Sequence, residues 1–169
     1  MSVYDALGGE QGVLALTDRF YDLMDLEPQY AALRAVHSDT LDYARDRLFK
    51  FLSGWLGGPD LYQQQYGHPR LRQRHFPFAV TLQLRNEWLA CFAQALQESA
   101  VERDLAEMLL LKLFALGDWM RNQNEPQYAP PQPPMAADEQ QCRAELAAVL
   151  PQYAVCTYFQ TASQPQESK

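Results

Sequence analysis

Hydrophobic residues recur at intervals of three and four along most of this 169-residue chain. That interval places side chains on one face of an α-helix, and the strict alternation typical of a half-exposed strand is absent. The pattern therefore predicts an all-α fold. The long helices are expected to cover residues 10–25, 41–55, 82–98 and 101–122.

Glycines, prolines and small polar residues separate these expected helices. Gly8-Gly9 precedes the first helix, and Pro28 closes it. The second helix follows the side-chain oxygens of residues 38–40, which suit an N-cap, and stops at the Gly-Gly-Pro run that begins at Gly57. Residues 59–77 show little periodicity, so we expect a loop with one or two short helical turns.

The character of the chain changes after residue 124, where five prolines fall within nine residues and predict an extended spacer. A short helix is expected over residues 138–150. We therefore divide the chain into a core of residues 1–125 and a Pro-rich linker with a C-terminal extension, residues 126–169. The extension, with Tyr153, Tyr158 and Phe159, either docks on the core, pairs with another subunit, recruits a partner or stays a loose tail.

Composition excludes several classes of protein. The net charge of −7 and a pI near 4.9 argue against nucleic-acid binding. No apolar run approaches the roughly 20 residues of a membrane span. Three widely spaced cysteines, Cys91, Cys142 and Cys156, and an N-terminus without a secretory signal favour a reduced, cytoplasmic protein.

Residues 67–78 carry two of the three histidines and three arginines. A basic stretch of this kind is a phosphate-binding patch, a solvated face or a partner for carboxylates. His75 differs from its neighbours because aromatic residues follow it directly. A single imidazole cannot build a tetrahedral zinc site, yet it can supply the axial bond that haem iron needs, and nearby basic side chains can pair with the haem propionates. A purely structural histidine is the alternative.

Six strings, in the same order and at the same spacing, resemble the group II truncated haemoglobins. They are YDALGG from Tyr4, DRFYDLM from Asp18, LRAVH from Leu33, FLSGWLGGPDLY from Phe51, GHPRLRQRHFPF from Gly67 and WLACF from Trp88. The resemblance covers about three-quarters of the chain. Gln73 stands where relatives often have Met, and the segment after residue 124 departs from the family pattern.

The resemblance implies a shortened globin in which two helix pairs, a 2-on-2 sandwich, enclose a haem b. It assigns the iron ligand to His75 and the distal, ligand-facing positions to Tyr21, Trp88 and His37. Haem contacts implied in the same way are Ala44, Arg47, Leu48, Phe51, Leu71, Arg74 and Phe78.

The implied function is the binding of dioxygen, and of other diatomic gases such as NO and CO, at a ferrous haem. Two alternatives stay open: a nitric oxide dioxygenase or peroxidase-type enzyme working with a separate reductase, and a ligand sensor that acts through the C-terminal tail. The sequence leaves the physiological ligand, the redox partner and the oligomeric state undecided.

Overall fold

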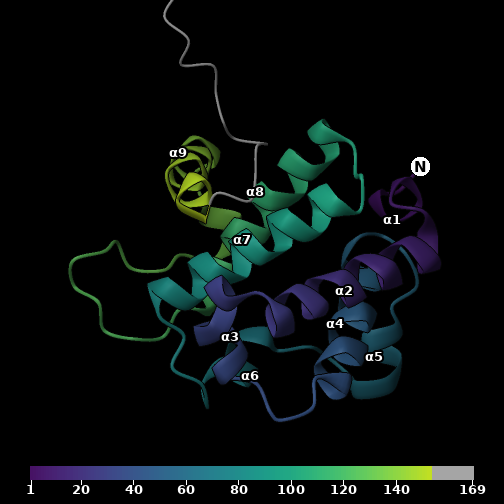
Figure 1. Ribbon diagram of the computed structural model, residues 1–169, viewed down its shortest axis with the longest axis horizontal. Coiled ribbons are helices and arrows are strands. Elements are labelled where there is room, and N and C mark those ends of the chain that lie inside the picture. Colours follow the sequence, from purple (N-terminus) through teal and green to yellow (C-terminus); the bar gives the residue numbers. More distant parts are fainter. Residues whose placement is uncertain (154–169) are drawn as a thin grey trace, which may run out of the picture.

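Two pairs of long helices form the frame of the computed structural model, which describes residues 1–153 (Figure 1). Helix α2 (Gly9–Leu26) packs against α4 (Asp42–Trp55), and α7 (Leu82–Glu98) packs against α8 (Arg103–Met120). Helix α2 also lies along α7, which joins the two pairs. No strand occurs in the described range, so the predicted all-α fold and the helix pairing are confirmed.

Local capping explains where these helices begin. The Thr81 side chain accepts a hydrogen bond from the Leu84 amide, which starts α7 at the predicted residue. The Glu102 carboxylate accepts from the first-turn amides of α8, which starts two residues later than expected. Helix α4 begins at Asp42, whose amide donates to Thr40 Oγ1 at 3.3 Å. The cap expected at residues 38–40 was therefore placed slightly early, since Leu41 occupies the N-cap position.

Helix α7 is the centre of the molecule, because eight consecutive residues, 89–96, are buried. Phe92 stacks on Phe20 of α2 with ring centroids 4.4 Å apart, and Trp88 meets Phe92 edge-on at 5.0 Å. The Cys91 thiol donates to the Phe20 carbonyl at 3.2 Å. Within this buried stretch a polar side chain needs a hydrogen-bond partner inside the protein.

The segments between the long helices contain shorter ones. The predicted short turns in residues 59–77 are confirmed as two helices, whereas the helical turns in residues 28–35 were not expected from the sequence. The short elements of the core are α1 (Val3–Ala6), η1 (Pro28–Tyr30), α3 (Ala31–Ala35), α5 (Leu61–Tyr66) and α6 (Leu71–His75).

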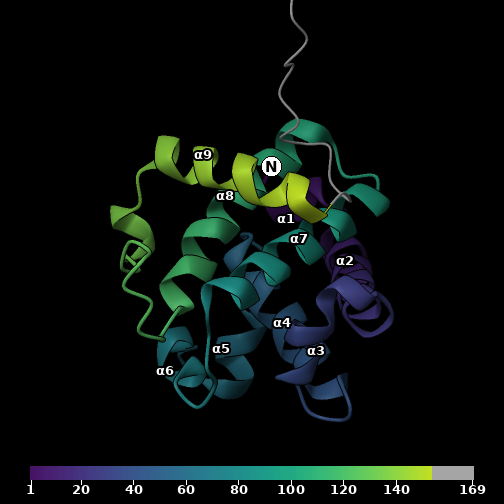
Figure 2. The same ribbon diagram turned by 60° about the vertical axis from the view of Figure 1, so that its left-hand side comes forward.

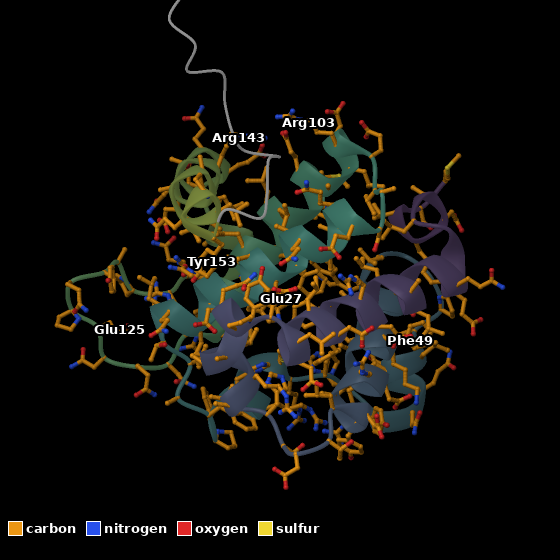
Figure 3. The ribbon with its side chains drawn as sticks, in the orientation of Figure 1. Glu27, Phe49, Arg103, Glu125, Arg143 and Tyr153 are labelled. Carbon is orange, nitrogen blue, oxygen red and sulfur yellow. The ribbon has the colours of Figure 1, made fainter. Side chains whose placement is uncertain are left out.

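The extension docks on the core as far as the structure describes it. After the Pro-rich stretch come η2 (Pro134–Ala136), α9 (Glu139–Val149) and η3 (Leu150–Tyr153). Helix α9 crosses over α8, and η3 reaches α7 (Figure 2). Tyr153 lies between α9 and α7 (Figure 3) and stacks on Tyr30 with centroids 6.3 Å apart. Cys156, Tyr158 and Phe159 lie outside the described residues.

Candidate functional site

His75 is the last residue of α6 and is half-buried. Its Nδ1 lies 2.7 Å from the Leu71 carbonyl oxygen. A carbonyl only accepts, so Nδ1 carries the hydrogen and Nε2 holds a lone pair. Nε2 makes no hydrogen bond within residues 1–153. An imidazole tied in this way is oriented as metal-ligating histidines are, with one nitrogen on a carbonyl and the other open.

The end of α8 holds the backbone around His75. Asn122 Nδ2 donates to the carbonyls of His75, at 3.0 Å, and Phe78, at 2.8 Å. Asn122 Oδ1 accepts from the Val80 amide at 3.0 Å. One amide side chain therefore makes three hydrogen bonds to the loop that follows α6. Sequence reasoning missed Asn122, since an asparagine beyond a helix end carries no distinctive spacing.

Tyr21 is buried in α2, with 5% of its surface exposed. Its ring meets the His37 ring edge-on at 6.0 Å, and the Arg45 guanidinium lies 5.7 Å from its centroid. Burial raises the pKa of Tyr21 above its ordinary value, and the Arg45 charge opposes this only in part. The phenol is therefore protonated at neutral pH, and its hydroxyl makes no hydrogen bond within residues 1–153.

His37 follows α3 and donates from Nδ1 to the Leu33 carbonyl at 2.9 Å. Burial lowers the pKa of His37, the Leu33 hydrogen bond raises it, and electrostatic interaction with Arg34 and His75 lowers it further. A neutral imidazole with hydrogen on Nδ1 presents Nε2 as an acceptor. In this state Nε2 of His37 accepts a hydrogen bond, and direct donation from Nε2 requires protonation.

A buried carboxylate positions the α3 segment. Glu87, 5% exposed, accepts from the Leu33 amide at 2.7 Å and from Gln83 at 3.2 Å. Leu33 in turn anchors His37, so α7 determines where that imidazole lies. Sequence reasoning missed Glu87, although a signal exists: it falls on the same helical face as Leu84 and Cys91, where a charge is out of place.

Trp88 lies on α7 and is half-buried beside the Phe20 ring, at 6.3 Å between centroids. Tyr21 meets the same Phe20 ring in a T-shaped contact at 5.0 Å, so both side chains contact Phe20. On the far side, α8 approaches so closely that a Cβ on Gly117 would lie 3.1 Å from the indole. The indole Nε1 donates to no group within residues 1–153.

Three of the expected haem contacts, Ala44, Leu48 and Phe51, lie half-buried on α4 and pack against the core. The Arg47 guanidinium stacks on Tyr43 at 4.0 Å and on Tyr66 at 5.0 Å. Arg47 Nε is the single buried side-chain nitrogen or oxygen without a hydrogen-bond partner in the described part of the chain. A buried donor of this kind suits an anionic oxygen.

The other expected contacts come from the His75 side. Leu71 is half-buried in α6, and Phe78 is 47% exposed. Arg74 Nε donates to the Pro69 carbonyl at 2.8 Å, and its guanidinium carbon lies 5.7 Å from the Tyr62 ring centroid. The residues present fit a flat apolar cofactor with acidic substituents: one open imidazole, apolar side chains from two helices, and arginines at the margin.

Comparison with known sequences also indicates a globin. Residues 2–122 match the family of bacterial-like globins. A group 2 truncated hemoglobin of Bacillus subtilis is 34% identical over 122 residues, which covers 72% of this chain and 89% of that protein. The chain belongs to the group II truncated haemoglobins.

Solved structures of relatives have the same fold as this truncated globin. The cold-adapted truncated hemoglobin of Pseudoalteromonas haloplanktis is 41% identical with a TM-score of 0.71, covering 73% of this chain and 100% of that chain. The group II 2-on-2 hemoglobin of Agrobacterium tumefaciens is 40% identical with a TM-score of 0.71, covering 73% and 96%. The predicted 2-on-2 fold is confirmed, and membership of this family implies haem-based binding of small ligands.

Proposed function

We propose that this truncated globin binds dioxygen at a haem b whose iron is held by His75. The observation that carries the proposal is an oriented His75 imidazole, open at Nε2, together with the protonated hydroxyl of Tyr21, which makes no hydrogen bond within residues 1–153. A relative supports the choice of ligand. The truncated haemoglobin of Bacillus subtilis described as oxygen-avid is 32% identical with a TM-score of 0.67, covering 72% of this chain and 100% of that chain.

The cofactor would be held from both sides. His75 Nε2 would bind the iron, while apolar contacts would come from Ala44, Leu48, Phe51, Leu71 and Phe78. Arg47 and Arg74 would pair with the propionates. The unpartnered Nε of Arg47 supports this role, because a carboxylate there would offset the free-energy cost of the buried donor.

The bound haem supplies an iron that bonds diatomic ligands, and the distal side chains select among them. Tyr21 donates a hydrogen bond, which favours a ligand whose outer atom gains negative charge, as in dioxygen. Trp88 is a donor only and adds to that preference without removing a proton. Neutral His37 accepts at Nε2, so it can orient a water that donates to the ligand.

The proposed oxygen binding extends to other ligands, to redox chemistry and to the location of the protein. We propose that NO and CO bind at the same position, and that any nitric oxide oxidation or peroxide chemistry draws electrons from a separate reductase. A cytoplasmic location is part of the same proposal. No helix within residues 1–153 is long and apolar enough to cross a membrane.

Absorption spectra test the haem assignment directly. Purified wild type should show a Soret band that moves on reduction and again with oxygen and with carbon monoxide. His75→Gly should lose the normal ferrous spectrum and recover it with added imidazole. His68→Gly, a change at an exposed histidine of the same segment, should match wild type. A wild type without a Soret band after haem reconstitution, or an unchanged His75→Gly spectrum, would defeat the proposal.

A further inference from the structure

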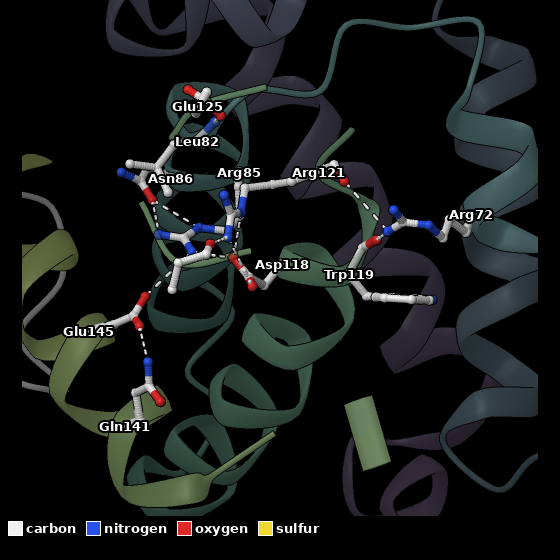
Figure 4. A network of polar contacts seen from close by, with 11 residues as sticks. Arg72, Leu82, Arg85, Asn86, Asp118, Trp119, Arg121, Glu125, Gln141 and Glu145 are labelled. Carbon is white, nitrogen blue, oxygen red and sulfur yellow. Dashed lines mark hydrogen bonds and ion pairs between the residues drawn. The ribbon is translucent and has the colours of Figure 1, made fainter. Parts of the chain in front are cut away.

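Four charged side chains join the extension to the core. Arg85 of α7 and Arg121, just after α8, are each 4% exposed, and both bind the Asp118 carboxylate. The fourth member is Glu145 of α9, whose Oε2 lies 3.5 Å from Arg85 Nη1. Figure 4 shows Arg85 and Arg121 converging on Asp118, with Glu145 reaching Arg85 from α9. We refer to these four residues as the ionic cluster.

The core alone leaves the ionic cluster unbalanced. Two buried guanidiniums share one carboxylate, and an uncompensated buried charge is costly. The extension supplies further hydrogen-bond acceptors for the two arginines. Glu145 brings the second carboxylate, and the Ala129 carbonyl accepts from Arg121 Nη2 at 2.7 Å. Docking of residues after 126 is therefore tied electrostatically to two buried arginines of the globin core.

The same end of α8 holds the helix that carries His75. The Arg72 guanidinium on α6 donates to the Trp119 carbonyl, stacks on the Trp119 ring at 4.0 Å, and reaches the Arg121 carbonyl at 3.5 Å. One residue further on, Asn122 donates to the His75 carbonyl at 3.0 Å. Residues 118–122 thus bind the extension on one side and the His75 segment on the other.

The extension leaves a cavity beside the ionic cluster, although Cys142 and Leu146 of α9 pack into the core. A cavity of about 510 Å³ lies between α7, α8, α9 and the Pro-rich stretch, and the ionic cluster forms part of its wall. Beside this cavity, the polar contacts of the cluster add to the apolar packing of α9 in fixing how the extension lies over α8. Loss of one cluster contact can shift the end of α8 without disrupting the core.

We propose that Glu145 and Arg121 are positioning residues for His75, so that the C-terminal extension sets the orientation of the imidazole that holds the haem iron. The effect passes through Asp118, Arg72 and Asn122. The inference rests on the proposed haem ligation. Coupling of this kind is reciprocal, so haem binding at His75 also stabilises docking of α9.

Resonance Raman spectroscopy of the ferrous, ligand-free protein measures the iron–histidine bond. Glu145→Gln removes the charge on α9 with little change of shape, and it should shift or broaden the iron–histidine stretching band. The rate of CO association should change by about twofold or more. Glu139→Gln is the matched control: the same substitution on the same helix, at a carboxylate that is 76% exposed and pairs only with Arg143 across 3.8 Å. It should keep the wild-type band.

A second measurement on wild type keeps the inference testable if Glu145→Gln folds poorly. Hydrogen exchange in Glu139–Val149 should be faster in the haem-free protein than in the haem-loaded protein, and the first half of α8 should change less. Equal protection in both forms, or a Glu145→Gln band identical to wild type, would overturn the coupling. A wild type with no Soret band would instead defeat the haem assignment itself.

Discussion

At the scale of single residues, the distal side contains polar groups that the protein does not satisfy. The Tyr21 hydroxyl and the Trp88 indole nitrogen make no hydrogen bond within residues 1–153, although both side chains are largely enclosed. Arg47 Nε is the one fully buried side-chain donor without a partner in the described residues, so the Tyr21 and Trp88 donor atoms stay accessible, and a bound ligand that accepts from them gains a hydrogen bond. Both side chains contact the Phe20 ring, with centroids 5.0 Å and 6.3 Å away.

Replacing these donors should accelerate ligand loss. Tyr21→Phe and Trp88→Phe should each raise the dissociation rate of oxygen by about tenfold or more, because a hydrogen bond to a partly charged atom is lost. Stopped-flow measurement of oxygen release tests this. Tyr30→Phe is the control, since the Tyr30 hydroxyl already donates to Gln94 at 2.7 Å. Off-rates equal to wild type in both variants would remove their assigned roles.

His37 should make stability depend on pH. Burial lowers its pKa below the ordinary value of 6.5, so the unfolded chain binds a proton more readily than the folded one. The contribution of neutral His37 to the free energy of unfolding is therefore complete above pH 6.5. It is lost as the pH falls toward the folded-state pKa of His37. Urea unfolding at about pH 7.5 and about pH 5 should show a smaller loss of stability in His37→Phe than in wild type. His68→Phe, at an exposed position, should behave as wild type does; an equal pH response in all three proteins would contradict this.

At the scale of elements, α3 depends on a partner far along the chain. Five residues form too short a helix to be stable alone, and Glu87 of α7 holds it through the Leu33 amide. The connection matters because α3 leads directly into His37. The position of one distal side chain is thus determined by a carboxylate on a different helix.

Glu87→Ala should lower the free energy of unfolding by about 1–3 kcal/mol, since the Leu33 amide loses its partner in a buried place. Urea denaturation measures the loss. The control is Glu98→Ala on the same helix, where an exposed pair with Arg19 contributes about 1 kcal/mol or less. Equal effects of the two substitutions would show that Glu87 does not anchor α3.

At the scale of the whole molecule, the extension and the globin core share buried surface. Leu146 of α9 is fully buried and Leu150 is 1% exposed. Tyr153 adds a stacked contact to Tyr30, which precedes α3. The division of the chain at residue 125 stays a prediction, and shared packing of this kind favours one cooperative unfolding transition.

Leu146→Ala tests that cooperativity. A buried leucine truncated to alanine costs about 2–5 kcal/mol. All three tryptophans, Trp55, Trp88 and Trp119, lie in the core, so their fluorescence reports unfolding of the globin part alone. The tryptophan transition should move to lower urea in Leu146→Ala and stay in place in Leu26→Ala, where the side chain is 73% exposed. An unmoved transition in Leu146→Ala would show that the extension folds separately.

The sequence by itself determined the long helices, and the family resemblance it carries supplied the candidate residues. Helix formation is local: each backbone hydrogen bond joins residues four apart, and caps such as Thr81 lie beside the turn they start, so spacing and caps were enough to predict α7. The same holds for α9, which was predicted over residues 138–150 and runs from Glu139 to Val149 with Cys142, Leu146 and Val149 buried. The histidine-rich segment and its aromatic neighbours could be identified as a candidate site without knowledge of any long-range contact.

Only the tertiary structure decided what those residues contact. Glu87 reaches Leu33 across 54 positions, Asn122 reaches His75 across 47, and Glu145 reaches Arg85 across 60. Spacing along one helix carries no information about a partner on another. For the same reason the acceptor state of His37 and the docking of the extension followed from packing. Burial sets protonation and desolvates charges, and burial exists only once the helices have assembled.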